Sequence, residues 1–180
     1  MMGEQPDEQP RITQPHEHQA FETSYPITLT NLCGAPVVVV GGGAVGGRKL
    51  HGLLAVGAAV RLISPAATPD LRALADNGAI TWLARPYQPG DLAGARLVFA
   101  ATDQRAVNAQ VADDAAALGL LCNVADDPRA GDFHLPAVHR EPGLLVAVST
   151  AGASPARAKR LRDQIAAWLA AGRTAQEGHE

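Results

Sequence analysis

Residues 37–46 read VVVVGGGAVG, four valines that run directly into a glycine-rich loop. A continuous β-branched run is typical of a parallel strand that is buried on both faces. The loop holds the pattern Gly41-x-Gly43-x-x-Gly46, and a helical pattern of leucines follows it. A strand, this glycine spacing and a helix in direct succession favour a dinucleotide-binding loop; a glycine-rich turn without a ligand is the alternative.

Each of the three glycines meets a physical need of such a loop. Gly41 permits a tight turn, Gly43 lets a pyrophosphate approach the backbone, and Gly46 lets the helix pack closely on the strand. The start of the helix then offers unpaired N–H groups and a partial positive charge to the phosphates.

The end of the second predicted strand departs from the usual NAD pattern. An NAD site commonly has an acid there to bind the ribose, but this strand ends in Ile63-Ser64-Pro65-Ala66. Ser64 either makes one hydrogen bond to the cofactor or begins a turn. The residues by themselves therefore leave the choice between NAD and NADP open.

Strand-like and helix-like segments alternate on the C-terminal side of the loop. This alternation predicts right-handed βαβ units and a parallel sheet with helices on both faces, an α/β fold of the Rossmann type. After residue 126 the pattern changes to two strands joined by Glu141-Pro142-Gly143, and then to a last helix capped by Ser154. We expect strands at 37–40, 60–63, 80–83, 97–101, 120–124, 133–138 and 144–149, and helices from the glycine loop to residue 57 and at 70–77, 104–118 and 154–171.

The chain has 180 residues, enough for one domain with a small appendage. Its apolar fraction of 47% and charged fraction of 18% are typical of a globular protein. Residues 1–24 are acidic and lack apolar periodicity, so we expect a disordered tail there. The predicted organisation continues with a Rossmann domain at 25–126, a small β segment at 127–153, and a terminal helix and tail at 154–180.

Several classes of protein are excluded by composition. No apolar run is long enough to span a membrane, and the N-terminus has no apolar leader, which predicts a cytoplasmic protein without membrane contact. Cys33 and Cys122 are far apart and outside any CxxC pattern, which argues against a disulfide framework or a cysteine zinc site. No metal-ligand spacing occurs among His, Cys and Glu. The net charge of −3 argues against a broad nucleic-acid-binding surface.

The ends of the fourth and fifth predicted strands form the crevice in which an open α/β sheet binds ligands. Thr102 and Asp103 follow the fourth strand as candidate cofactor contacts, although Asp103 is equally a candidate helix N-cap. Asp126 follows the fifth strand and is either a base or substrate orienter, or a turn former. Arg48 and Lys49, near a helix N-terminus, are either solvated or meet an anionic substrate, a phosphate or a partner subunit.

The motifs Gly41-Gly42-Gly43-x-Val45 with Arg48-Lys49, Ala101-Thr102-Asp103 with Val107-Asn108, Cys122-Asn123-Val124-x-Asp126-x-Pro128, Phe133-x-x-Pro136 and Ser149-x-x-Gly152-x-Ser154-Pro155 occur in this order. Together they resemble the siroheme-synthase type of precorrin-2 dehydrogenase, a family whose N-terminal part is both a dehydrogenase and, in some members, a sirohydrochlorin ferrochelatase. The resemblance extends from about residue 25 to residue 168.

This resemblance implies NAD-dependent oxidation of precorrin-2 to sirohydrochlorin in siroheme biosynthesis, with ferrous iron as a further substrate in some members. It maps the catalytic aspartate onto Asp126 and cofactor contacts onto Ala44, Val45, Pro65 and Ala66. The family is dimeric and exchanges strands between subunits. The segment 127–153 is therefore expected to make a homodimer, and no resident metal is expected.

Precorrin-2 is a large polycarboxylate, so its cleft requires cations without the whole protein being basic. We assign substrate contacts to Arg48, Asn123, Arg129 and His134, although each cation taken singly is more often a solvated residue. A rival interpretation from another class is a non-catalytic NAD(H)-sensing regulatory module. A third is a dehydrogenase that acts on a different anionic substrate.

Overall fold

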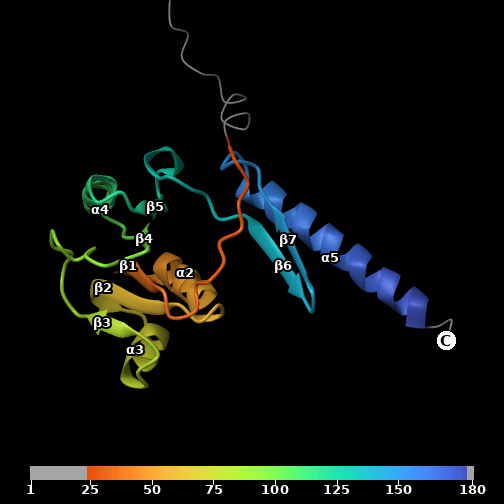
Figure 1. Cartoon of the computed structure of the whole chain (residues 1–180), viewed down its shortest axis with the longest axis horizontal. Coiled ribbons are helices and arrows are strands. Elements are labelled where there is room, and N and C mark those ends of the chain that lie inside the picture. The colour runs from red at the N-terminus through yellow and green to blue at the C-terminus, as the bar shows by residue number, and fades with distance from the viewer. Residues whose placement is uncertain (1–23, 178–180) are drawn as a thin grey trace, which may run out of the picture. The chain divides into compact units, whose positions relative to one another are not determined.

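A five-stranded parallel sheet organises the larger of two compact units. The computed structural model describes residues 24–177 (Figure 1). Residues 27–135 form one compact unit, and residues 136–177 together with 24–26 form the other. The sheet has the strand order β3-β2-β1-β4-β5, and all its neighbouring pairs are parallel. Its strands are β1 (Pro36–Gly42), β2 (Ala59–Ala67), β3 (Thr81–Leu83), β4 (Leu97–Ala100) and β5 (Leu121–Val124).

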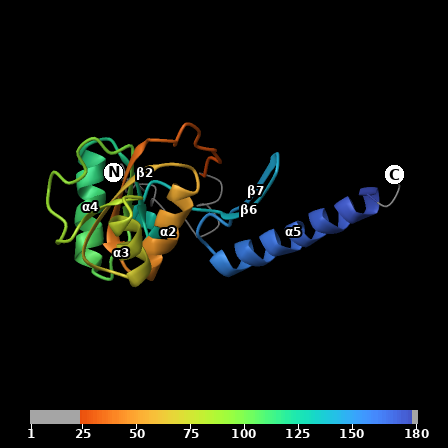
Figure 2. The same ribbon diagram turned by 90° about the horizontal axis from the view of Figure 1, so that it is seen from below.

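Helices cover both faces of this sheet. Alternate valines of β1 point to opposite faces, so Val37 and Val39 join one core cluster while Val38 and Val40 join the other. The first cluster includes leucines of α2 (Ala44–Leu54) and α3 (Pro69–Asp76), and the second includes Val111 of α4 (Arg105–Ala117). Accordingly, α4 lies on the opposite side of the sheet from α2 and α3 (Figure 2). The predicted α/β fold of the Rossmann type is confirmed.

β2 is longer than predicted, because it continues through Ser64 and Pro65 to Ala67. The Ser64 hydroxyl donates to the Ala66 carbonyl at 2.7 Å, and the indole N–H of Trp82 donates to the Ser64 carbonyl at 2.9 Å. Ala67 then pairs with Gly42 across a bulge in the register. These contacts hold the chain in the sheet past a proline, which sequence patterns treat as a strand end.

The smaller unit consists of a hairpin and a long helix. β6 (Ala137–Glu141) and β7 (Leu144–Val148) are antiparallel, and α5 (Pro155–Glu177) follows them. The Ser154 hydroxyl accepts from the Arg157 N–H at 3.3 Å, as expected of an N-cap. The guanidinium of Arg162 donates to the Val138 carbonyl at 3.0 Å and so ties α5 to β6.

The first strand of this hairpin begins later than the predicted 133–138. Phe133 belongs to the larger unit, where its ring meets that of Phe99 edge-on with the centroids 5.6 Å apart. Its carbonyl accepts a hydrogen bond from the Asn123 amide at 2.7 Å. Side-chain packing therefore removes Phe133 from the strand that its position in the sequence suggested.

The predicted domain boundaries at 126/127 and 153/154 remain predictions. The predicted disordered tail, residues 1–24, lies outside the described residues except for Ser24. Within residues 24–177, no helix combines the length and the apolar character that crossing a membrane requires.

Candidate active site

The glycine loop joins β1 directly to α2, and its glycines have three different surroundings. Gly41 has φ +117°, and a Cβ there would overlap the Ala101 carbonyl of the neighbouring chain segment. A Cβ on Gly46 would overlap the Gly41 carbonyl. By contrast, a Cβ on Gly43 would meet no atom of the described residues within 4 Å. The space beside Gly43 is where a ligand can approach the backbone.

Gly42 has a role that the sequence pattern did not predict. A Cβ at this position would overlap the Ala66 carbonyl, because Gly42 pairs with Ala67 of β2. The close approach brings the end of β2 against the glycine loop. The signal available in the sequence was the glycine between Gly41 and Gly43, a position at which the dinucleotide pattern has no requirement.

The start of α2 has the character of a phosphate-binding terminus. Gly43 is its N-cap, and within residues 24–177 no side chain caps this end and no acid occupies its first turn. The exposed Ala44 and Val45 begin the helix. Uncapped N–H groups and an open approach at Gly43 are what a dinucleotide pyrophosphate requires, so these residues fit the cofactor.

The predicted cofactor residues at the end of β2 divide into two kinds. Ser64 is buried and its hydroxyl is held by Ala66, so this side chain shapes the end of the strand. Pro65 and Ala66 are exposed beside the glycine loop. The alternative that Ser64 begins a turn was wrong, because β2 continues through Ser64 to Ala67.

A network of hydrogen bonds links the ends of β4 and β5. Asn108, in the second turn of α4, is buried, and its amide bonds both the N–H and the carbonyl of Thr102. The same amide donates to Oδ1 of Asp126 at 2.7 Å. Asp126 is exposed at the end of β5. The two loops that the sequence placed at one edge of the sheet are therefore connected through a residue to which the sequence assigned no role.

Asp103 does not cap α4, so that alternative was wrong. The N-cap of this helix is Gln104, whose side chain makes no capping hydrogen bond. The Gln104 N–H donates to the Thr102 hydroxyl at 3.1 Å. Asp103 is exposed. Thr102, rather than Asp103, thus supplies the side-chain acceptor for the backbone N–H at the start of this helix.

Asp127 shapes the turn that follows β5. Its carboxylate accepts from the Arg129 N–H and from the Arg105 guanidinium, each at 3.1 Å. The backbone hydrogen bond from Arg129 is the main reason that the pKa of Asp127 lies below its ordinary value, and Arg105 adds to the effect. The Arg129 side chain is 95% exposed and its Nε lies 3.9 Å from Asp127, so it remains accessible to a ligand.

Lys49 is half-buried and its ammonium is hydrogen-bonded, so the interpretation of Lys49 as a freely solvated side chain was wrong. Its ammonium donates to the Asn123 amide oxygen at 2.5 Å and lies 5.6 Å from the centroid of the Phe99 ring. Burial lowers the pKa of Lys49, and the charge of Arg48 lowers it further. Asn123 is 5% exposed, with its amide engaged by Lys49 and by the Phe133 carbonyl. Arg48 and His134 are exposed.

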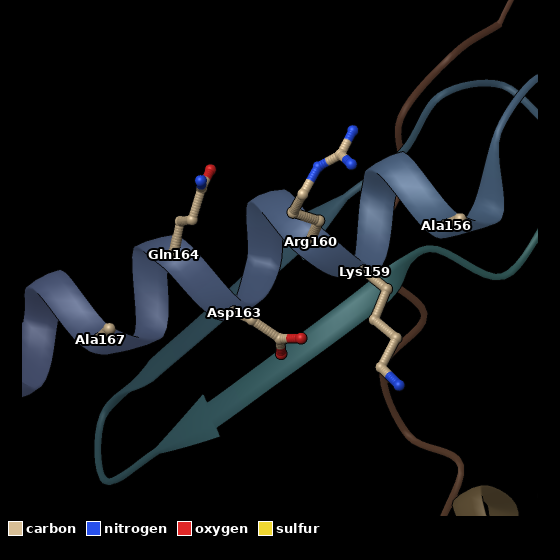
Figure 3. Close-up of a pocket in the computed structure, with 6 residues that line it drawn as sticks. All are labelled: Ala156, Lys159, Arg160, Asp163, Gln164 and Ala167. Atoms are coloured by element: carbon tan, nitrogen blue, oxygen red, sulfur yellow. The ribbon is translucent and has the colours of Figure 1, made fainter.

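Other parts of the described chain offer no rival centre. Residues 24–177 contain no group of three or more His, Cys, Asp or Glu that would hold a metal ion. α5 carries an open hollow from which Lys159 and Arg160 extend in different directions (Figure 3). The hollow is lined by Ala156, Lys159, Arg160, Asp163, Gln164 and Ala167, a mixed set without a catalytic pair.

A family of proteins described as putative NAD(P)-binding matches residues 28–137, which contain the whole sheet and the glycine loop. The chain belongs to this family. A second family description, sirohaem biosynthesis protein central, matches residues 143–167. The NAD(P)-binding assignment agrees with the nicotinamide cofactor expected from the glycine loop.

The proteins that are similar to this chain in sequence include siroheme synthases. The chain is 45% identical over 134 residues to siroheme synthase 1 of Aeromonas salmonicida (strain A449), a match that covers 74% of this chain and 29% of the relative. It is 47% identical over 130 residues to the siroheme synthase of Methylococcus capsulatus (strain ATCC 33009 / NCIMB 11132 / Bath), covering 72% and 27%. The chain thus spans less than a third of the length of these relatives.

A solved structure has a similar fold. This structure, named SirC, precorrin-2 dehydrogenase, aligns with a TM-score of 0.69 and 28% identity over 80% of this chain and 70% of that one. The resemblance to the siroheme-synthase type of dehydrogenase, drawn from the ordered motifs, is confirmed.

Proposed function

We propose that this protein catalyses the NAD-dependent oxidation of precorrin-2 to sirohydrochlorin in siroheme biosynthesis. The observation that carries the proposal is the carboxyl edge of β1, β4 and β5. The open, uncapped start of α2 follows β1 there, and the exposed carboxylate of Asp126 follows β5, with β4 between the two strands. The similarity to SirC and to the siroheme synthases supports the choice of substrate.

The proposed division of labour follows from these positions. Gly41, Gly43 and Gly46 shape the pyrophosphate site, with Ala44, Val45, Pro65 and Ala66 beside it and Ser64, Thr102 and Asp103 shaping its rim. NAD, when bound, supplies a hydride acceptor. Asp126 accepts the proton that the substrate loses with the hydride, so that oxidation removes one hydride and one proton.

Substrate carboxylates are proposed to meet the exposed cations Arg48, Arg129 and His134. Asn123 would act differently from the direct contact first assigned to it, because its buried amide holds the Lys49 ammonium. A lysine held in place near this edge contributes a fixed positive charge to the approach of a polycarboxylate.

We further propose a cytoplasmic homodimer in which residues 127–153 provide the subunit contact. Leucines of the hairpin and Trp168 of α5 are exposed in the single chain, with 39% of Leu144, 41% of Leu145 and 73% of Trp168 accessible. Apolar side chains gathered on one unit mark an interaction site. Ferrous iron is a proposed second substrate.

The test is anaerobic incubation of the purified protein with enzymatically made precorrin-2 and NAD, following sirohydrochlorin by its absorbance. Asp126→Asn is expected to lower kcat by about 10² to 10⁴-fold, because it removes the proton acceptor. The matched control is Asp127→Asn, which changes the neighbouring carboxylate that is held by Arg105 and is expected to retain turnover. Equal losses in both variants would refute the assignment of Asp126.

Calorimetric titration with NAD and with NADP separates the remaining possibilities. Gly43→Ala is expected to weaken dinucleotide binding without unfolding the protein, because its Cβ fills the space where the phosphates approach. Wild-type protein that binds NAD but gives no product would favour the NAD(H)-sensing module. Adding ferrous iron to the productive reaction tests chelation.

A further inference from the structure

One buried amide holds together the two loops that end β4 and β5. Oδ1 of Asn108 accepts from the Thr102 N–H at 3.0 Å and lies 2.7 Å from the Thr102 hydroxyl. Nδ2 donates to the Thr102 carbonyl at 3.1 Å and to Oδ1 of Asp126 at 2.7 Å. A primary amide has two donor hydrogens and two acceptor positions, so this network uses the whole capacity of Asn108. With 1% of its surface exposed, Asn108 is shielded from solvent.

The chemistry of the partners fixes which way the amide faces. A backbone N–H can only donate and a carbonyl can only accept, so the two bonds to Thr102 place Oδ1 and Nδ2 without ambiguity. The second hydrogen of Nδ2 then points to Oδ1 of Asp126, which must accept. The ionised carboxylate is the form that accepts at either oxygen. The bond from Asn108 therefore holds the Asp126 carboxylate in the form of a hydrogen-bond acceptor.

The other charged groups near Asp126 are engaged elsewhere or lie in solvent. Arg105 of α4 and Arg129, which follows β5, both contact Asp127, and Asp103 at the start of α4 is exposed. Among the residues that the structure describes, Asn108 bonds Asp126 at Oδ1, and no side chain or backbone group bonds its Oδ2. One carboxylate oxygen is held, and the second is available to a substrate.

We propose that Asn108 is the positioning residue of the reaction: it holds Oδ1 of Asp126 so that Oδ2 accepts the substrate proton. This inference rests on the proposed dehydrogenase function. A carboxylate held through one oxygen by a buried and fully bonded amide loses rotational freedom, and a reacting group that is displaced by about 1 Å loses about 10²-fold in rate. The inference predicts that Asn108 and Asp126 act as one unit.

The experiment is a double-mutant cycle on kcat, with Asn108→Ala, Asp126→Asn and the combined variant. Asn108→Ala is expected to lower kcat by about 10 to 10²-fold and to leave the KM for precorrin-2 and the affinity for NAD within about threefold of wild type. In the Asp126→Asn background, the same change is expected to alter kcat by less than about twofold, because the group that it positions is already gone.

Val111→Ala is the matched control for loss of stability. Val111 is fully buried in the same helix, one turn further along, and contacts the core beneath it rather than the loops. It is expected to lower the melting temperature as Asn108→Ala does, with kcat within about twofold of wild type. Comparable loss of kcat in this control would assign the effect of Asn108 to stability and overturn the inference.

Two other outcomes are decisive. Full additivity of Asn108→Ala and Asp126→Asn, in a wild-type protein that is active, overturns the positioning role but leaves the proposed function intact. A folded, NAD-binding wild type that does not oxidise precorrin-2 overturns the proposed function, and the positioning role with it. The two failures are therefore distinguishable in one set of assays.

Discussion

The two compact units of this protein differ in how they bury their apolar residues. In residues 27–135, the four valines of β1 expose at most 1% of their surface, and Leu50 of α2 and Leu71 of α3 are fully buried. In residues 136–177, Ala158 is the one hydrophobic side chain recorded as buried among those that the structure describes. The larger unit carries its own core, whereas the apolar side chains of the smaller unit lie at its surface.

This contrast teaches that the smaller unit, in which α5 is the element packed against the hairpin, leaves apolar surface for a partner. A two-stranded hairpin is marginal in water unless it packs against something else, and only part of the apolar stripe of α5 is covered within its own unit. The proposed homodimer covers that surface.

The strongest test of this contrast between the two units replaces one glycine by alanine in each of them. Gly46→Ala is expected to destabilise the larger unit by more than about 3 kcal/mol, because its Cβ overlaps the Gly41 carbonyl and the backbone must move. Gly172→Ala in α5 meets nothing in the described residues within 4 Å and is expected to stabilise the helix by up to about 1 kcal/mol. Urea unfolding measures both changes, and similar losses would contradict the contrast.

Leucine truncations in the two units sharpen the comparison further. Leu62→Ala in β2, where the leucine is fully buried, is expected to cost about 2 to 4 kcal/mol of unfolding free energy. Leu145→Ala in β7 is expected to change the stability of a single protomer by less than about 0.5 kcal/mol. Sedimentation should instead show that Leu145→Ala shifts the dimer equilibrium towards protomers. An unchanged dimer would exclude this face from the contact.

The smallest expected effect is on the stability of the larger unit at acidic pH. Asp91 accepts a bidentate bond from Arg85 at 2.7 and 2.8 Å, and this bond holds the pKa of Asp91 below its ordinary value of 3.8. A lowered pKa contributes stability that is complete above the unfolded-state pKa and is lost as the pH falls through the folded-state pKa. Asp91→Asn is therefore expected to reduce stability at pH 7 and to flatten its decline below about pH 4.

The matched control for acid is Asp163→Asn in the smaller unit, where the carboxylate is 57% exposed and pairs with the adjacent Arg162. Exposed pairs contribute little to stability, so its unfolding curve should follow wild type at each pH. An Asp91→Asn curve that also follows wild type at each pH would show that the Arg85 bond does not hold the loop between β3 and β4.

Much of the fold could be predicted from the sequence, because its main signals are local. The valine run, the glycine spacing and the alternation of segments each depend on a few consecutive residues, and the sheet follows from them by the handedness of βαβ units. The errors were at positions where a distant partner intervenes. β2 continues past Pro65 because Trp82 and Gly42 hold it there, and Phe133 leaves the hairpin strand because Phe99 packs against it.

The candidate site shows the same difference between features set by local sequence and features set by contacts between distant residues. Spacing alone predicted a role for Gly43, whereas the place of Asp126 after a strand left it open between a base and a turn former, and the catalytic role proposed for it came from the family resemblance. The Lys49–Asn123 contact joins residues 74 positions apart, and the bond from Asn108 to Asp126 spans 18 positions. Helical spacing puts Asn108 on a face of α4 but says nothing of which loop that face meets.

The sequence by itself determined the sheet, the glycine loop and the family, since these depend on local backbone preference and on apolar periodicity. Only the tertiary structure decided which polar groups meet: that Lys49 bonds to the buried Asn123, that Asp103 is left in solvent, and that Asn108 holds Asp126. The physical reason is that a buried polar group must find a hydrogen-bond partner, and the partner is chosen by what folding brings within about 3 Å rather than by neighbours along the chain.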